Sequence, residues 1–120
     1  MALKITEREV DGVTVLDLDG RIVLGEETTG LREKVKGLLA AGKKKLVLSM
    51  QNVTFIDSSG LGALVAVHSS AKSSGATIRL CNLGSRTNEL LLITKLVTVF
   101  EIAASEADAV RSFSQAASAD

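Results

Sequence analysis

The sequence predicts a single α/β domain with a mixed, mostly parallel β-sheet, an antiparallel hairpin at its start and about four helices. The chain has 120 residues, which is the size of one domain. Hydrophobic residues make up 46% of it and aromatic residues only 2%. The core must therefore be aliphatic and β-branched, as in strands covered by helices. Strand-like segments also alternate with segments of helical periodicity, which is typical of strands joined by helical crossovers.

The first two strands are predicted to form a hairpin. In Leu3–Val10, apolar residues stand among charges, as expected of an edge strand. Asp11-Gly12 follows, and both residue types tolerate the positive φ that a tight hairpin turn requires. The run Val13–Leu18 is predicted as the second strand, antiparallel to the first, and Asp19-Gly20 is expected to end it.

The middle of the chain predicts helix, strand and helix. From Glu26 the apolar residues recur at i, i+4, i+7 and i+8, which is one face of a helix that ends before Gly42. Lys45–Met50 is apolar on both faces, as expected of a central strand. Val53–Ile56 then leads into a second helix that is expected to reach about Ser73.

The last third predicts a strand at Thr77–Leu83, a short helix from Ser85 to about Thr94 and a final strand at Val97–Ile102. A terminal helix is marked by Ala109, Val110 and Phe113. We expect residues 1–114 to form the domain and residues 115–120 to be a short polar tail.

The charge and composition of the chain argue against nucleic-acid binding and against a membrane-spanning or secreted protein. Fourteen basic and fourteen acidic residues cancel, so no electrostatic footprint for nucleic acid is expected. Few aromatic residues are available to stack on unpaired bases. The basic run Lys43–Lys45 is interpreted as a solvated loop before a strand. The N-terminus lacks the apolar stretch of a signal peptide and no run reaches membrane-spanning length, which predicts a cytoplasmic protein.

Cofactor and metal sites are not expected. Cys81 is the only cysteine and His68 the only histidine, so neither an internal disulfide nor a set of metal ligands is available. Cys81 is expected to be a buried structural thiol.

One segment, Phe55–Gly62, contains the side chains that are candidates for a functional site. Asp57 or Ser58 can cap a following helix by accepting hydrogen bonds from its free N–H groups. A phosphate added there would meet the same N–H groups and the positive end of the helix dipole. Local chemistry alone favours a plain capping motif, and it does not distinguish Ser58 from Ser59 as a phosphate acceptor.

From Val13 to about Phe113 the chain resembles the STAS domain family, and specifically the anti-sigma factor antagonists. The first matching feature is the segment Val15–Ile22 followed by an amphipathic helix. The second and most specific is Phe55-Ile56-Asp57-Ser58-Ser59-Gly60-Leu61-Gly62. Weaker landmarks are Asn82-Leu83 and Leu92–Leu96 leading into Val99-Phe100.

The resemblance implies a phosphorylation switch and not an enzyme. In the family, an anti-sigma factor serine kinase phosphorylates the first Ser of Asp-Ser-Ser-Gly. The unphosphorylated domain binds that kinase and frees the sigma factor, and a PP2C-type phosphatase resets the cycle. Carried over, the acceptor is Ser58, flanked by Asp57, Ser59 and Gly60. The protein is expected to be a monomer or a weak dimer, with no cofactor.

The docking surface is expected to combine the helix after Ser58 with the loop from Arg21 to Glu27. Its expected partner-binding residues are Arg21, Val23, Glu26, Leu61 and Gly62. Such antagonists often carry Gly-Glu-(Ile/Leu)-Asp after the second strand, whereas this chain has Gly20-Arg21-Ile22-Val23. The departure bears on the identity of the partner and not on the fold.

Three rival functions are disfavoured. A Ser-His-Asp hydrolase is disfavoured because His68 lies ten residues beyond Ser58 on the same predicted helix, about 15 Å away. A dinucleotide site is disfavoured because Val65 occupies the place of the third glycine. Phosphorylation of Asp57 as in a receiver domain is disfavoured because the early acidic pair, Asp17 and Asp19, lies on a hairpin strand.

An alternative within the same fold stays open. STAS domains also serve as scaffold or regulatory docking subunits of signalling assemblies or transporters, without an obligatory phosphorylation switch. The intact motif at Ser58 favours the switch, whereas Val23 leaves the scaffold interpretation open.

Overall fold

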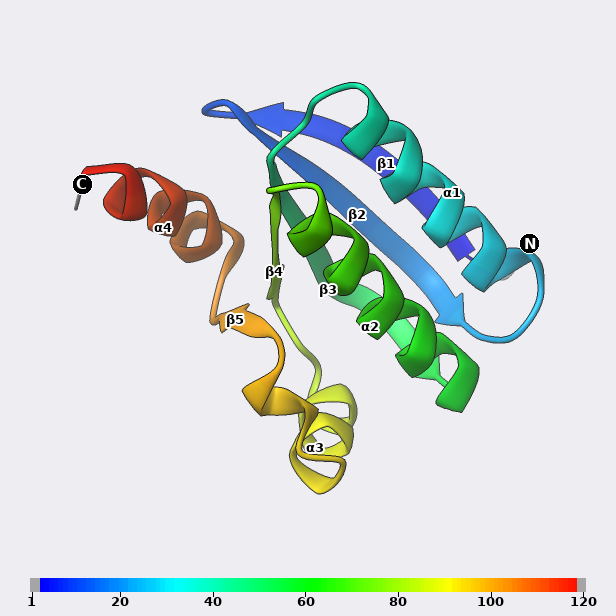
Figure 1. The fold of residues 1–120 in the computed structure, drawn as a ribbon. Helices are drawn as coiled ribbons and strands as arrows, with labels where there is room; N and C mark the ends of the chain where they lie inside the picture. Colours follow the sequence, from blue (N-terminus) through cyan, green and yellow to red (C-terminus); the bar gives the residue numbers. More distant parts are fainter. Residues whose placement is uncertain (1–2, 119–120) are drawn as a thin grey trace.

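The alternating sequence pattern produces a five-stranded sheet whose strands stand in chain order, β1-β2-β3-β4-β5 (Figure 1). The computed structural model describes residues 3–118 of the chain. The β1–β2 pair is antiparallel and the other three pairs are parallel. The strands are β1 (Leu3–Val10), β2 (Val13–Ile22), β3 (Lys45–Ile56), β4 (Thr77–Cys81) and β5 (Glu101–Ala103).

Four α-helices and one short 3₁₀ helix connect and cover the strands. They are α1 (Glu26–Ala40), α2 (Ser58–Ser73), α3 (Ser85–Ile93), η1 (Leu96–Thr98) and α4 (Glu106–Ser118). The α/β fold class expected from the sequence is therefore confirmed, including the N-terminal hairpin. None of the helices in the described part of the chain is both long and apolar enough to span a bilayer.

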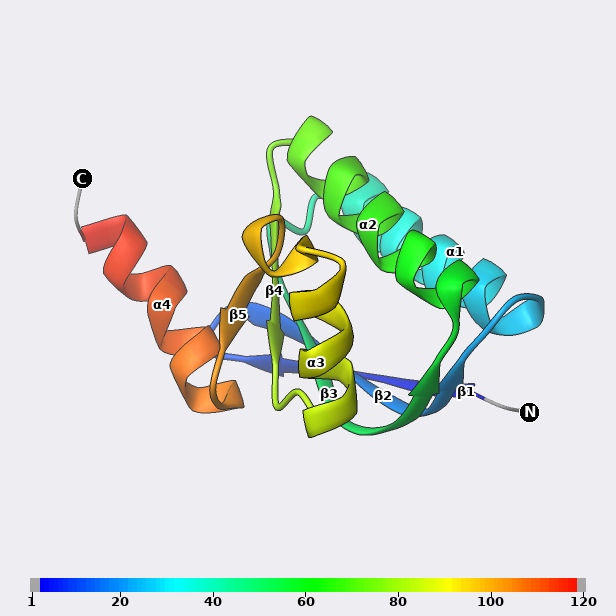
Figure 2. The same ribbon diagram turned by 90° about the horizontal axis from the view of Figure 1, so that it is seen from below.

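Alternation along the central strands builds a core on each face of the sheet. Leu16, Leu48 and Leu80 are 0–1% exposed and pack with the apolar faces of α1, α2 and α3. Figure 2 shows α1 and α2 side by side over this face. On the other face Val15 and Val47 pack against α4 in a smaller cluster, which also contains Val13, Cys81, Ala109, Val110 and Phe113.

Strand β2 does not end at Asp19-Gly20 as expected but continues to Ile22. Gly20, at φ 121°, stays in the ladder and pairs with Leu3 on one side and Val53 on the other. Strand β3 likewise runs without a break to Ile56. The β2–β3 ladder contains two register shifts, one between Asp17 and Asp19 and one between Gly20 and Arg21. The two strands nevertheless remain paired up to their ends at Ile22 and Ile56.

Three boundaries in the last third of the chain also differ from expectation. Strand β4 stops at Cys81 because Asn82 takes a left-handed conformation at φ 56°. The strand expected at Val97–Ile102 is confirmed only at its end: Val97 and Thr98 belong to η1, and β5 is limited to Glu101–Ala103, which pair with β4. Helix α4 continues to Ser118, past the expected boundary at 114, and residues 119–120 lie outside the described part.

Helix α4 is also joined to the hairpin by ion pairs. The Arg8 guanidinium on β1 donates to the Asp17 carboxylate on β2 at 2.6 and 2.9 Å. It also donates to Glu106 at the start of α4, at 2.6 and 3.2 Å. One side chain therefore ties both hairpin strands to the first turn of α4.

Candidate functional site

The Asp57–Gly60 motif lies where two parallel strands end together. Ile22 at the end of β2 pairs with Ile56 at the end of β3, and α2 begins two residues later at Ser58. The carboxyl ends of parallel strands are where α/β proteins usually place their functional sites. The motif therefore lies between the end of β3 and the start of α2, and not in a long loop.

Asp57 is the N-cap of α2. Its backbone is extended, at φ −95° and ψ −177°, and its Oδ1 accepts from the Gly60 N–H at 2.7 Å. Its Oδ2 accepts from the backbone N–H of Leu24 at 3.1 Å, in the loop between β2 and α1. These two donors, first Gly60 and then Leu24, hold the pKa of the Asp57 carboxyl below its usual value. Asp57 therefore stays charged and links the loop to the helix.

Gly60 allows α2 to start directly against the end of β2. A Cβ added at Gly60 would lie 1.9 Å from the carbonyl oxygen of Ile22, which leaves no room for any side chain. That carbonyl also accepts from the Asp57 N–H at 3.3 Å. A Cβ added at the exposed Gly62, two residues further along α2, would meet no atom within 4 Å.

The two hydroxyls of the motif differ in their surroundings. Ser58, the first residue of α2, is exposed. Ser59 is only partly exposed and lines a cavity of about 380 Å³ with Leu24, Thr28, Thr29, Arg32 and Gly62. An approaching enzyme can therefore reach the Ser58 hydroxyl more freely than that of Ser59, a difference that the sequence could not show.

The expected docking residues are brought together only in part. Arg21 and Glu26 are exposed on either side of the β2–α1 loop, and Gly62 is exposed on α2. Val23 is half-buried within that loop. Leu61 is only 9% exposed and belongs to the core, which corrects the expectation that it faces a partner.

Two exposed apolar residues beside the motif were missed. Leu24 is 74% exposed in the β2–α1 loop, and Phe55 is 47% exposed near the end of β3. Neither had a sequence signal of its own, because an apolar residue at a strand end is usually a core residue.

His68 and Cys81 each have a structural environment of their own. His68 packs edge-on against Phe100, with ring centroids 5.5 Å apart, as a boundary residue of α2. Cys81 is buried as expected, and burial raises the pKa of its thiol to about 11. Within residues 3–118, no three His, Cys, Asp or Glu side chains gather as metal ligands would.

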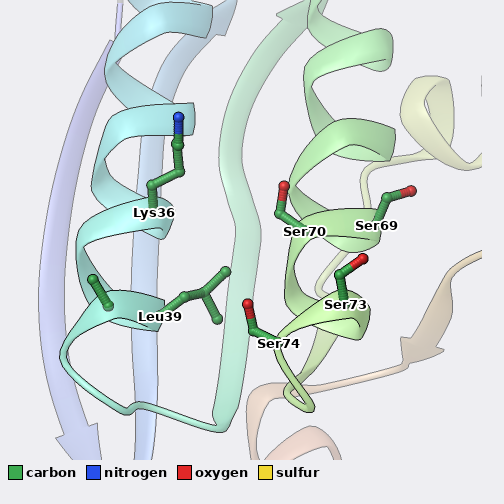
Figure 3. Close-up of a pocket in the computed structure, with 7 residues that line it drawn as sticks. Lys36, Leu39, Ser69, Ser70, Ser73 and Ser74 are labelled. Carbon is green, nitrogen blue, oxygen red and sulfur yellow. The ribbon is translucent and has the colours of Figure 1, made fainter.

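A second cavity lies at the opposite end of α2. It has a volume of about 540 Å³ between α1 and α2, with Lys36 and Leu39 on one side (Figure 3). Hydroxyls line the other side, from Ser69, Ser70, Ser73 and Ser74. Nearby, Lys44 Nζ donates to the Ser74 carbonyl at 2.5 Å and Lys43 pairs with Glu9 at 3.7 Å. Two lysines of the basic run thus have local structural partners.

Comparison with known proteins gives one consistent family. The sequence model of the STAS domain matches residues 4–109. The anti-sigma-B factor antagonist of Bacillus subtilis is 35% identical over 74 residues, which are 62% of this chain and 67% of that protein. BtrV of Bordetella bronchiseptica, provisionally named an anti-sigma factor antagonist, is 24% identical over 114 residues, 95% of this chain and 97% of that one.

Solved structures share the fold. The crystal structure of an anti-sigma factor antagonist from Mycobacterium paratuberculosis superposes with a TM-score of 0.78 over 92% of both chains, at 22% identity. The murine anion transporter Slc26a9 superposes with a TM-score of 0.72 at 24% identity, over 91% of this chain and 18% of the transporter. At these identities the structural likeness shows the fold alone.

Proposed function

The chain belongs to the STAS domain family, and from this premise we propose that it is an anti-sigma factor antagonist switched by phosphorylation of Ser58. The unphosphorylated form binds an anti-sigma factor serine kinase in the cytoplasm, and the sigma factor held by that kinase is released. Phosphorylation of Ser58 ends the binding, and a PP2C-type phosphatase restores it. Relatives named as anti-sigma factor antagonists support this function.

The observation that carries the proposal is the exposed Ser58 hydroxyl at the first position of α2. The kinase can align this oxygen with the γ-phosphorus of ATP. The Ser58 oxygen bonds to phosphorus, the bond to the ADP oxygen breaks, and the hydroxyl proton passes to a base of the kinase. The antagonist needs only to position the hydroxyl, because the partner supplies the metal site and the phosphate contacts.

Charge explains how the phosphate acts on binding. Phosphoserine carries about −1.5 to −2 charges at pH 7, and the adjacent Asp57 already carries one negative charge. The local charge would therefore change from about −1 to about −2.5 or −3. Burying such a group against a surface fitted to a neutral hydroxyl costs several kcal/mol, on the order of what separates a strong complex from a weak one. The antagonist itself tolerates the phosphate because Ser58 is exposed.

A second candidate function has one specific observation in its favour. Arg21 is exposed beside the motif, where such antagonists often carry an acid, and Val23 supplies no carboxylate. A partner surface that differs from that of the usual kinases fits this change. The chain would then be a scaffold or regulatory docking subunit of a signalling assembly or a transporter, without an obligatory phosphorylation switch.

Intact-mass spectrometry with site mapping tests the proposal. The protein is incubated with ATP and serine kinases purified from its host, alongside Ser58→Ala and Ser59→Ala. We expect one added phosphate in the wild type and in Ser59→Ala, mapped to Ser58, and none in Ser58→Ala. Phosphate on Ser59 would correct the site, whereas no phosphate with any host kinase would favour the docking subunit.

A further inference from the structure

We propose that the partner kinase inserts an extended segment into a groove between β3 and α3, in addition to contacting Ser58; this inference rests on the proposed function. The β3–α3 groove has a volume of about 430 Å³. Its β3 side is formed by Val53, Thr54, Phe55 and Ile56, and its α3 side combines Leu90 and Ile93 with the polar Arg86, Thr87 and Glu89.

The β3 side of the groove is an open sheet edge. Strand β4 pairs with β3 only from Lys45 to Ser49, so β3 continues for seven further residues with β2 as its single neighbour. Among the described residues, no hydrogen bond reaches the backbone of residues 51–56 from the α3 side. An open edge of this kind offers N–H and C=O groups to a strand from another chain.

Exposed apolar side chains stand on both walls of the groove. Phe55 is 47% exposed on β3, and Ile93 is 72% exposed on α3. An added strand that places every second side chain between them would bury both walls. The open edge of β3 and the exposed Phe55 and Ile93 together favour an extended segment with alternate apolar side chains over a helix.

The position of the groove selects the kinase as the source of that segment. Ile56 lines the groove, and Ser58 follows two residues later. Because a strand rises about 3.3 Å per residue, a segment paired along β3 ends within about 7 Å of the acceptor along the chain direction. The protein that acts on Ser58 is thus the one that can occupy the groove at the same time.

A second copy of this chain is a poorer occupant. Its own long outer edge strand, β1, exposes Lys4 and Glu9, and such charges on an edge strand oppose pairing beside the exposed Phe55 and Ile93. Dimerisation through the groove would also cover the approach to Ser58.

The affinity test uses two adjacent residues of α3 as a matched pair. Ile93 lines the groove, whereas Leu92 is 55% exposed and does not. The probe is the purified, ADP-loaded kinase that phosphorylates Ser58, and Kd is measured for the wild type, Ile93→Asp and Leu92→Asp. Because both side chains are exposed, both variants should fold. We expect Ile93→Asp to weaken binding about tenfold or more, and Leu92→Asp to change it less than about threefold.

Amide hydrogen exchange tests for the added strand. In the complex, exchange at the amides of residues 51–56 that point away from β2 should slow. Equal effects of the two α3 variants, or no new protection at residues 51–56, would overturn the groove proposal while leaving the Ser58 switch intact. If no host kinase binds or phosphorylates the wild-type protein, the proposed function itself is wrong. The proposed occupant of the groove is then wrong as well.

Discussion

The backbone N–H of Leu24 donates to Oδ2 of Asp57 at 3.1 Å, across 33 positions of sequence. The same carboxylate caps α2 through Gly60. The loop that exposes Leu24 and the helix that presents Ser58 are therefore fixed to each other by one charged side chain. Changes at Asp57 should act on folding and on the shape of the docking surface together.

Replacing Asp57 by Asn should lower stability in a pH-dependent way. The folded-state pKa of Asp57 is depressed, so its charge contributes stability that is present above its unfolded pKa of about 4 and is lost as pH falls through the folded pKa. We expect Asp57→Asn to have a lower Tm than the wild type at pH 7. The difference should narrow below about pH 4, as measured by thermal unfolding.

The matched control for this pH effect is Asp19→Asn. Asp19 is exposed on β2, and no donor among the described residues bonds to its carboxylate. A difference between wild type and Asp57→Asn that is independent of pH would contradict the role of the charge.

Gly60→Ala and Gly62→Ala should have opposite effects. At Gly60 the methyl group would overlap the Ile22 carbonyl, so α2 must move away from β2, at a cost of about 2 kcal/mol or more. At Gly62 the methyl group meets open space, and the helix should gain about 0.5–1 kcal/mol. Urea unfolding of both variants checks this. Similar stabilities would show that the close approach at Gly60 is unimportant.

Arg8→Met should loosen α4. The guanidinium joins Asp17 and Glu106, but all three side chains are 29–40% exposed, so the loss should be about 1 kcal/mol or less. Amide exchange of residues 106–113 should become faster while that of β3 is unchanged. Arg111→Met, which removes only the exposed pair with Asp108, serves as the control and should leave exchange nearly unaltered.

Substitutions at Ser58 separate folding from binding. Ser58→Asp should fold normally, because the residue is exposed, and bind the kinase at least about tenfold more weakly. Ser58→Ala should bind and resist inactivation, so that the sigma factor is released constitutively. Calorimetric titration with the purified kinase measures both. Wild-type affinity in Ser58→Asp would argue against a charge-based switch.

The sequence predicted the fold class and most elements because hydrophobic periodicity and turn residues are local signals. It placed the start of β5 too early, at Val97 instead of Glu101, because three residues that pair only with β4 have little pattern of their own. It placed the end of β2 too early because Gly20, a turn signal by type, is accommodated inside a ladder with shifted register. In both cases the strand boundary depends on pairing with a strand that is distant in the sequence.

The candidate site was predicted less completely. The motif from Asp57 to Gly60 could be found by resemblance, and its capping role followed from residue type. The exposure of Leu24 and Phe55 and the burial of Leu61 could not be found, because they depend on how β2, β3 and α2 pack together. The different exposure of Ser58 and Ser59 likewise depends on the packing of α2 beside α1, where Ser59 lines a cavity.

The most direct test of the switch is the Kd of the purified kinase for two forms of the same protein, one unphosphorylated and one phosphorylated on Ser58. We expect the phosphorylated form to bind about a hundredfold more weakly, in line with an uncompensated charge at a buried contact. Equal affinities for the two forms would contradict the account and leave the chain as a docking subunit.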